Sequence, residues 1–222
     1  MASDAATPEP GARGGRPSRD EAAQLTSRIL DAATAQLLAH GYGATSIEAV
    51  AKAARISKRT FYHRFAGKPE LFEAVVRRMI AGWRMPFDAT MAVDWGPLAP
   101  RLATIARITL AAALSPPALA LHRLILAEAP RFPELARVIN AHGHDAGVRA
   151  LAALLAAEAH AGRIAVADPV FAAEQFLHLV IAAPQRRALG LGMPLGAPEI
   201  EQWIERTIAL FLDGVGAGGS RR

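Results

Sequence analysis

The chain has 222 residues, of which 52% are hydrophobic and 20% charged, so it can bury a large core and is too apolar for a disordered protein. It contains no cysteine, which excludes a disulfide framework, a thiol nucleophile and any zinc site built on Cys. No uncharged apolar run approaches the roughly 18 residues of a membrane span, and residues 1–24 lack the apolar segment of a signal peptide. We therefore expect a cytoplasmic protein with no membrane contact.

The net charge of +5 belongs to the first third of the chain. Residues 1–84 hold 13 Lys and Arg against 8 Asp and Glu, whereas residues 85–222 hold 12 of each. Six cations fall within residues 52–68, and no acidic residue lies among them: Lys52, Arg55, Lys58, Arg59, Arg64 and Lys68. Such a patch suits a polyanion, because Lys and Arg displace counterions from phosphates. A solvated basic face is the alternative.

The N-terminal part divides into an arm and a set of short helices. Residues 1–17, rich in Ala, Gly and Pro, predict a flexible arm. Ser18-x-x-Glu21 is a capping box, which opens a helix that ends at Gly41. Thr45-x-x-Glu48 is a second capping box and opens a short helix over residues 46–53. Three residues later Ser57 caps a third helix, and a fourth begins near residue 69 and ends at residue 84.

Two short helices joined by a three-residue turn in a basic segment are the layout of a helix-turn-helix, whose second helix lies in the DNA major groove. The spacing of Phe61 and Phe65 predicts that both rings face inward. The side chains of the opposite face can all donate hydrogen bonds to bases or phosphates: Lys58, Arg59, Thr60, Tyr62 and His63.

Residues 41–71, GYGATSIEAVAKAARISKRTFYHRFAGKPEL, resemble the DNA-binding head of the TetR family of bacterial transcriptional regulators. The matching positions include Gly41-Tyr42, Thr45, Ala51, Ala54, Ser57, Tyr62, Phe65 and Lys68. The resemblance implies that Thr45, Tyr62 and Lys68 hold phosphates. It implies that Lys58, Arg59 and Thr60 face base edges.

Three positions depart from the family pattern. Arg55 stands where the turn usually has Gly, and a positive φ there would cost about 1 kcal/mol. Arg59 stands where Gly is frequent and adds a long donor. Arg64 replaces the usual Tyr or His, and we expect it to reach a phosphate. In the arm, Arg16 resembles arginines that enter the minor groove, and a solvated tail is the alternative.

Residues 85–213 predict a second helical domain, followed by a disordered tail over residues 214–222. Helices are expected at 98–114, 117–129, 133–161, 168–189 and 198–213, and no β-like alternation appears. The prediction is thus an all-α fold of about nine helices, with a DNA-binding domain over residues 18–84.

Residues 121–139, LHRLILAEAPRFPELARVI, are similar to a stretch in the AefR-like branch of TetR regulators. This resemblance implies a ligand-binding and dimerisation domain whose last two helices pair with their symmetry mates. Two apolar stripes fit such a seam and fit an intramolecular core equally well: Phe171, Gln175 and Leu179, and then Ile200, Ile204, Ile208 and Phe211. Candidate contacts for a small-molecule effector, each of which also fits a core position, are Trp83, Phe87, Trp95, His122 and Phe176.

The segment from His142 to Asp145 invites a metal interpretation, but helix positions i and i+2 point to different faces and no third ligand is evident. We therefore predict no metal and no cofactor. No catalytic motif, phosphate loop or dinucleotide fingerprint is present, so we do not expect an enzyme.

The combined prediction is a homodimeric transcriptional repressor that a small-molecule inducer releases from a palindromic operator in double-stranded DNA. Two alternatives remain: an all-helical small-molecule-binding protein or enzyme whose basic head does not read DNA, and an architectural DNA binder.

Overall fold

The computed structural model describes residues 19–92 and 96–216. These residues form helices and loops with no strand among them, which confirms the all-α fold. The helices are α1 (Arg19–Ala44), α2 (Ile47–Ala53), α3 (Lys58–Tyr62), α4 (Lys68–Ala92), α5 (Leu98–Ala113), α6 (Pro116–Glu128), α7 (Pro133–Ile139), the π-helical turn η1 (Asn140–His144), α8 (Asp145–His160), α9 (Pro169–Ala188) and α10 (Ala197–Gly216). Arg16 and Trp95 lie outside the described residues, as do the side chains of Trp83 and Phe87.

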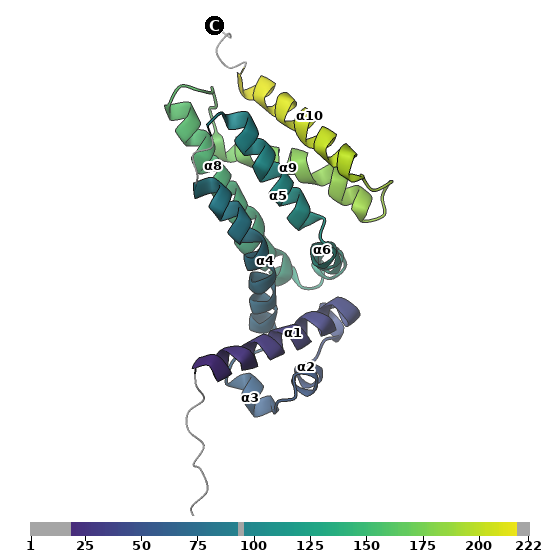
Figure 1. The fold of residues 1–222 in the computed structure, drawn as a ribbon. Helices are drawn as coiled ribbons and strands as arrows, with labels where there is room; N and C mark the ends of the chain where they lie inside the picture. Colours follow the sequence, from purple (N-terminus) through teal and green to yellow (C-terminus); the bar gives the residue numbers. More distant parts are fainter. Residues whose placement is uncertain (1–18, 93–95, 217–222) are drawn as a thin grey trace, which may run out of the picture.

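The first three helices form the head at one end of the molecule (Figure 1). The chain kinks at Gly41, whose φ of 81° and ψ of 169° end the regular part of α1. The predicted capping box at Thr45 is wrong in its register, because Ser46 is the N-cap of α2 and accepts a hydrogen bond from the N–H of Ala49. Thr45 is instead buried below the cap.

Helix α4 links the head to the rest of the molecule (Figure 1). It begins at Lys68 and runs without interruption to Ala92, so the expected helix end at residue 84 is wrong. The sequence-based boundary between two domains therefore falls inside one helix.

The buried side chains form two hydrophobic clusters. The first is built on α1 to α4, and Leu121, Leu124 and Leu135 of α6 and α7 complete it. The second joins α5, α8, α9 and α10. Since α6 and α7 pack with the head, the head is not an independent core.

The two stripes proposed as a dimer seam have different environments. Ile204, Ile208 and Phe211 are buried within their own chain, so the seam interpretation of the α10 stripe is wrong for these residues. Phe171 and Leu179 of α9 remain exposed.

The single helix expected over residues 133–161 is divided into α7, η1 and α8. The π-helical turn contains His142, Gly143 and His144, which agrees with the local bend considered for this segment. In the part of the chain that the structure describes, no single helix is long and apolar enough to cross a membrane, although α5 and α6, bent by 67°, satisfy the length and composition criteria as a pair.

Candidate nucleic-acid interface

The turn between α2 and α3 holds the two helices in the helix-turn-helix arrangement. The N–H of Ile56 donates to the carbonyl of Ala51 over 2.9 Å, and Arg55 has a φ of 55°. Arg55 thus has the positive φ that the glycine usual at this position of the family would adopt without strain. Ser57 then caps α3, because its hydroxyl accepts from the N–H of Thr60 at 3.0 Å.

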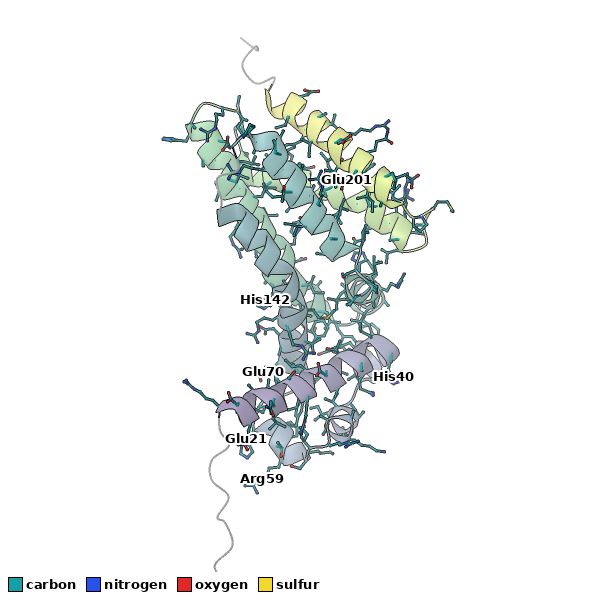
Figure 2. All side chains as sticks on the ribbon, viewed as in Figure 1. Glu21, His40, Arg59, Glu70, His142 and Glu201 are labelled. Atoms are coloured by element: carbon teal, nitrogen blue, oxygen red, sulfur yellow. The ribbon has the colours of Figure 1, made fainter. Side chains whose placement is uncertain are left out.

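The rings of two phenylalanines face inward and anchor α3 in the core of the head, as predicted. Phe61 is 0% exposed and Phe65 is 6% exposed, and their ring centroids lie 5.6 Å apart. The opposite side of the helix therefore faces away from the head. Tyr62 is 54% exposed, and Arg59 lies at the tip of the head, at the end of the molecule remote from α10 (Figure 2).

The described part of this outward surface combines four side chains that can donate hydrogen bonds. Lys58, Arg59, Tyr62 and His63 are all exposed on α3 or directly after it. We call these four residues the α3 face. It carries cationic and hydrogen-bond-donating side chains on one exposed helix, as a helix that enters the major groove of DNA does.

An acidic residue, Glu48, borders the α3 face, and the sequence did not predict this position. The carboxylate of Glu48 on α2 forms an ion pair with the ammonium of Lys58. The hydrogen bond from Lys58 is the main reason why the pKa of Glu48 is below its usual value. Glu48 precedes the acid-free run of residues 52–68, so only the turn between the helices brings it beside Lys58.

Thr45 and Thr60, the two threonines predicted to contact DNA, use their hydroxyls in local hydrogen bonds. Thr45 is buried, and its hydroxyl donates to the carbonyl of Gly41 at 2.7 Å. This placement does not support a side-chain contact from Thr45 to a phosphate. Thr60 is half-buried at the edge of the α3 face, and its hydroxyl lies 2.9 Å from that of Ser57.

Arg64 does not join the α3 face. Its guanidinium turns toward α1, where it donates to the hydroxyl of Thr26 at 3.0 Å. The expectation that Arg64 extends outward to a phosphate is therefore not supported by its conformation. The sequence could not reveal this bond, because Thr26 lies 38 residues earlier.

Lys68, at the start of α4, is half-buried. Its ammonium donates to the carbonyl of Gly43 at 3.1 Å and lies 4.5 Å from the ring centre of Tyr42. Burial lowers the pKa of Lys68, and the nearby charge of Glu128 opposes that shift. The ammonium thus stands at the junction of α1 and α4, beside rather than on the α3 face.

The two described candidates for effector contact lie in different surroundings. Phe176 is fully buried and packs edge-on against Phe211 at 5.0 Å between ring centres, which favours the core alternative. His122 on α6 is half-buried, and desolvation lowers its pKa. A surface hollow of about 430 Å³ lies instead on the head between α1 and α4, where Arg64, Glu70 and Arg78 are among its lining residues.

The two parts of the chain match two family descriptions. Residues 29–75 match the bacterial regulatory proteins of the tetR family. Residues 100–214 match the C-terminal domain of the AefR-like transcriptional repressors. Both matches agree with the resemblances drawn from residues 41–71 and 121–139.

The individual relatives match different shares of this chain. The transcriptional regulator UidR of Escherichia coli K12 is 33% identical over 79 residues, which are 34% of this chain and only 40% of UidR. The solved structure of the flavonoid-responsive regulator FrrA is 32% identical, covers 89% of this chain and all of its own, and has a TM-score of 0.76. A Mesorhizobium loti structure described as a TetR-family regulator is 27% identical over 90% of this chain and all of its own, with a TM-score of 0.75.

Proposed function

Because the chain belongs to the TetR family of DNA-binding transcriptional regulators, with a C-terminal domain of the AefR-like class, we propose that it is a repressor whose homodimer binds a palindromic operator and leaves it when a small molecule binds. The main support is how α3 packs on the head: Phe61 and Phe65 are buried, whereas the α3 face is exposed. Such a regulator acts on chromosomal DNA in the cytoplasm and needs no enzymatic step.

The α3 face supplies the contacts that read DNA. Arg59, at the tip of the head, is placed to reach a base edge, and a guanidinium pairs best with O6 and N7 of guanine. Lys58 and Thr60 lie beside it as further candidates for base contacts. Tyr62 and His63 are exposed and can donate to phosphates, and Lys68 contributes its charge from the start of α4.

The dimer would form on the exposed apolar side of the last two helices. Val170, Phe171 and Leu179 of α9 and Leu210 of α10 are large apolar side chains that remain exposed in the single chain. Exposed large apolar side chains that gather into a patch mark association sites. In a twofold dimer the same patch would cover itself, and the two heads would contact half-sites one helical turn, or a multiple of it, apart.

The effector would act on the spacing between these heads through α4, which is continuous from the head to Ala92. A ligand shifts this equilibrium only if it prefers one spacing over the other. FrrA is named for its response to flavonoids, so flavonoids are the first compounds to test.

Fluorescence anisotropy with a duplex from the DNA upstream of the chain's own gene tests DNA reading. We expect salt-dependent binding, because the cations displace counterions from phosphates. Tyr62→Ala and Lys68→Ala should weaken binding to all duplexes similarly, whereas Arg59→Ala should relax preference at one base pair by about 1–3 kcal/mol. Arg149→Ala, at an exposed arginine on α8, is the matched control and should leave binding unchanged.

Other outcomes distinguish the alternatives. Absent or salt-insensitive binding would favour a small-molecule-binding protein whose head does not read DNA. An architectural DNA binder would be favoured if no compound releases the DNA. This holds in particular for a flavonoid that binds the protein, as shown by a raised melting temperature, and still leaves the protein on DNA.

A further inference from the structure

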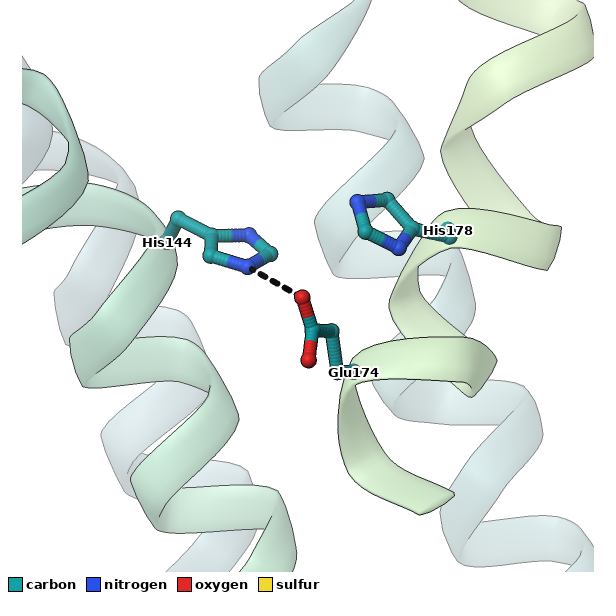
Figure 3. A group of neighbouring side chains, drawn as sticks. All are labelled: His144, Glu174 and His178. Carbon is teal, nitrogen blue, oxygen red and sulfur yellow. Dashed lines mark ion pairs between the residues drawn. The ribbon is translucent and has the colours of Figure 1, made fainter. Parts of the chain in front are cut away.

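Three potential metal ligands from two helical segments meet beside the π-helical turn (Figure 3). His144 is the last residue of η1, and Glu174 and His178 lie four residues apart on α9, so both point from the same side of that helix. We propose that His144, Glu174 and His178 bind a divalent transition-metal ion, for which Zn²⁺ is the best match. We call these three residues the His-Glu-His cluster.

The geometry is already close to that of a coordination sphere. One ligand atom from each residue lies within 4.8 Å of the other two, and the distance from Nε2 of His144 to Oε1 of Glu174 is 3.8 Å. Metal–ligand bonds of about 2.1 Å in tetrahedral geometry separate the ligand atoms by roughly 3.4 Å. Small side-chain rotations can therefore close the cluster around an ion.

The backbone beneath the cluster is held in place by packing. Gly147 lies on the first turn of α8, and a Cβ there would be only 3.7 Å from Cδ1 of Leu177, so the two helices approach closely beside the cluster. On the other side of the turn, His142 pairs with Glu73 of α4 at 3.1 Å. The π-helical turn is thus fixed between α4 and α9, which directs His144 toward α9 while His142 points to α4.

The ligand chemistry selects the class of ion. Two imidazoles and one carboxylate are ligands that Zn²⁺ accepts with a further position for water, whereas Mg²⁺ requires an octahedral set of oxygens. The imidazole rings of His144 and His178 stack with centroids 5.4 Å apart and an interplanar angle of 26°. In the part of the chain that the structure describes, His178 has no hydrogen-bond partner, so its ring nitrogens are available to a metal.

The sequence concealed this arrangement because only one of its members lies in the segment from His142 to Asp145. Glu174 and His178 follow His144 by 30 and 34 residues. The proposal is also independent of DNA binding and stands or fails on metal affinity alone.

Isothermal titration of the chelator-treated full chain with Zn²⁺ tests the proposal. We expect one ion per chain, with a rise in melting temperature that the same concentration of Mg²⁺ does not produce. Glu174→Gln and His178→Ala should each lower the affinity by at least about tenfold. His160→Ala removes an exposed histidine elsewhere on α8 and should leave the affinity unchanged.

Because Glu174 and His178 are on the surface side of α9, both variants should keep the helical circular dichroism spectrum and metal-free melting temperature of the parent chain. Zn²⁺ binding that is absent, or that is the same in the parent, Glu174→Gln and His178→Ala proteins, would overturn the proposal. Equal losses in His160→Ala and His178→Ala would overturn it as well, since they indicate non-specific surface binding.

Discussion

The backbone N–H of Gly43, just beyond the kink of α1, donates to Oε1 of Glu128 at the end of α6 over 3.3 Å. This bond joins the head to α6 beside the packing of Leu121 and Leu124 on the head's core. The other carboxylate oxygen, Oε2, is buried and accepts no hydrogen bond among the described residues. Glu128 therefore fits tightly against the glycine segment that ends α1.

The first prediction concerns Gly41 in this segment. Its φ of 81° and ψ of 169° lie in a region that is almost restricted to glycine, and a Cβ would come within 2.6 Å of Oε1 of Glu128. Gly41→Ala should lower the free energy of unfolding by about 1–3 kcal/mol, measured by urea denaturation. In a Glu128→Ala background the added cost should fall but not vanish, because the backbone strain remains.

Gly67→Ala is the matched control for this prediction. A Cβ at Gly67 would meet only Cδ of Pro69 at 3.7 Å, an ordinary contact. Equal stability of the Gly41→Ala and parent proteins would contradict the strained geometry at the end of α1.

The second prediction concerns the turn of the helix-turn-helix. Arg55 is exposed and has a φ of 55°, which glycine adopts without the steric cost of a Cβ. Arg55→Gly should raise the free energy of unfolding by about 1 kcal/mol. Lys52→Gly, inside α2, should instead lower it by about 1 kcal/mol. Chemical denaturation of the two variants side by side should therefore give changes of opposite sign.

The third prediction concerns the acidic residue beside the α3 face. Glu48 pairs with Lys58, and near a DNA backbone its negative charge opposes binding. Glu48→Gln should increase DNA affinity several-fold in dilute buffer, and the gain should shrink above about 0.1 M salt, where the screening length is about 10 Å. Anisotropy titrations at several salt concentrations measure this effect.

Glu205→Gln, at an exposed residue of α10, provides the comparison and should not change affinity. Weaker binding by Glu48→Gln would mean that Glu48 positions Lys58 for DNA instead of competing for it.

The fourth prediction concerns the buried residue Glu158, whose side chain is 3% exposed. It accepts hydrogen bonds from Arg163 at 2.6 and 2.9 Å and from Arg101 at 3.1 Å. The bonds from Arg163 are the main cause of a pKa below the ordinary 4.5, and burial opposes this shift. Because the folded state binds the proton less readily than the unfolded state, the stabilisation is complete above pH 4.5 and is lost as the pH falls through the folded-state pKa.

Glu158→Gln should therefore lower the free energy of unfolding by about 3 kcal/mol at pH 7, and the difference from the parent should shrink toward pH 3. Thermal unfolding across this pH range measures both effects. Glu201→Gln, which breaks the exposed pair with Arg107, should cost less than about 1 kcal/mol. Similar losses in the two variants would argue against a special role for burial at Glu158.

Much of the local structure could be read from neighbouring residues. Ser57 has a side chain that caps a helix, and Phe61 and Phe65 repeat at the spacing of one helical face. The departure from the family's usual glycine at Arg55 drew attention to the turn, but only the structure shows that φ is positive there. The cap and the inward face depend on interactions over a few residues, so the sequence alone determined α3 and the surface that it exposes.

Contacts between distant segments were decided only by the tertiary structure. Periodicity shows that Ile204, Ile208 and Phe211 share a face, but not whether α5 and α9 or a second chain covers it. Arg64 reaches Thr26 because α1 passes beside the end of α3. His144 gains its two neighbours because α8 packs on α9. A residue pattern specifies a face, whereas the partner of that face depends on how the helices pack in space.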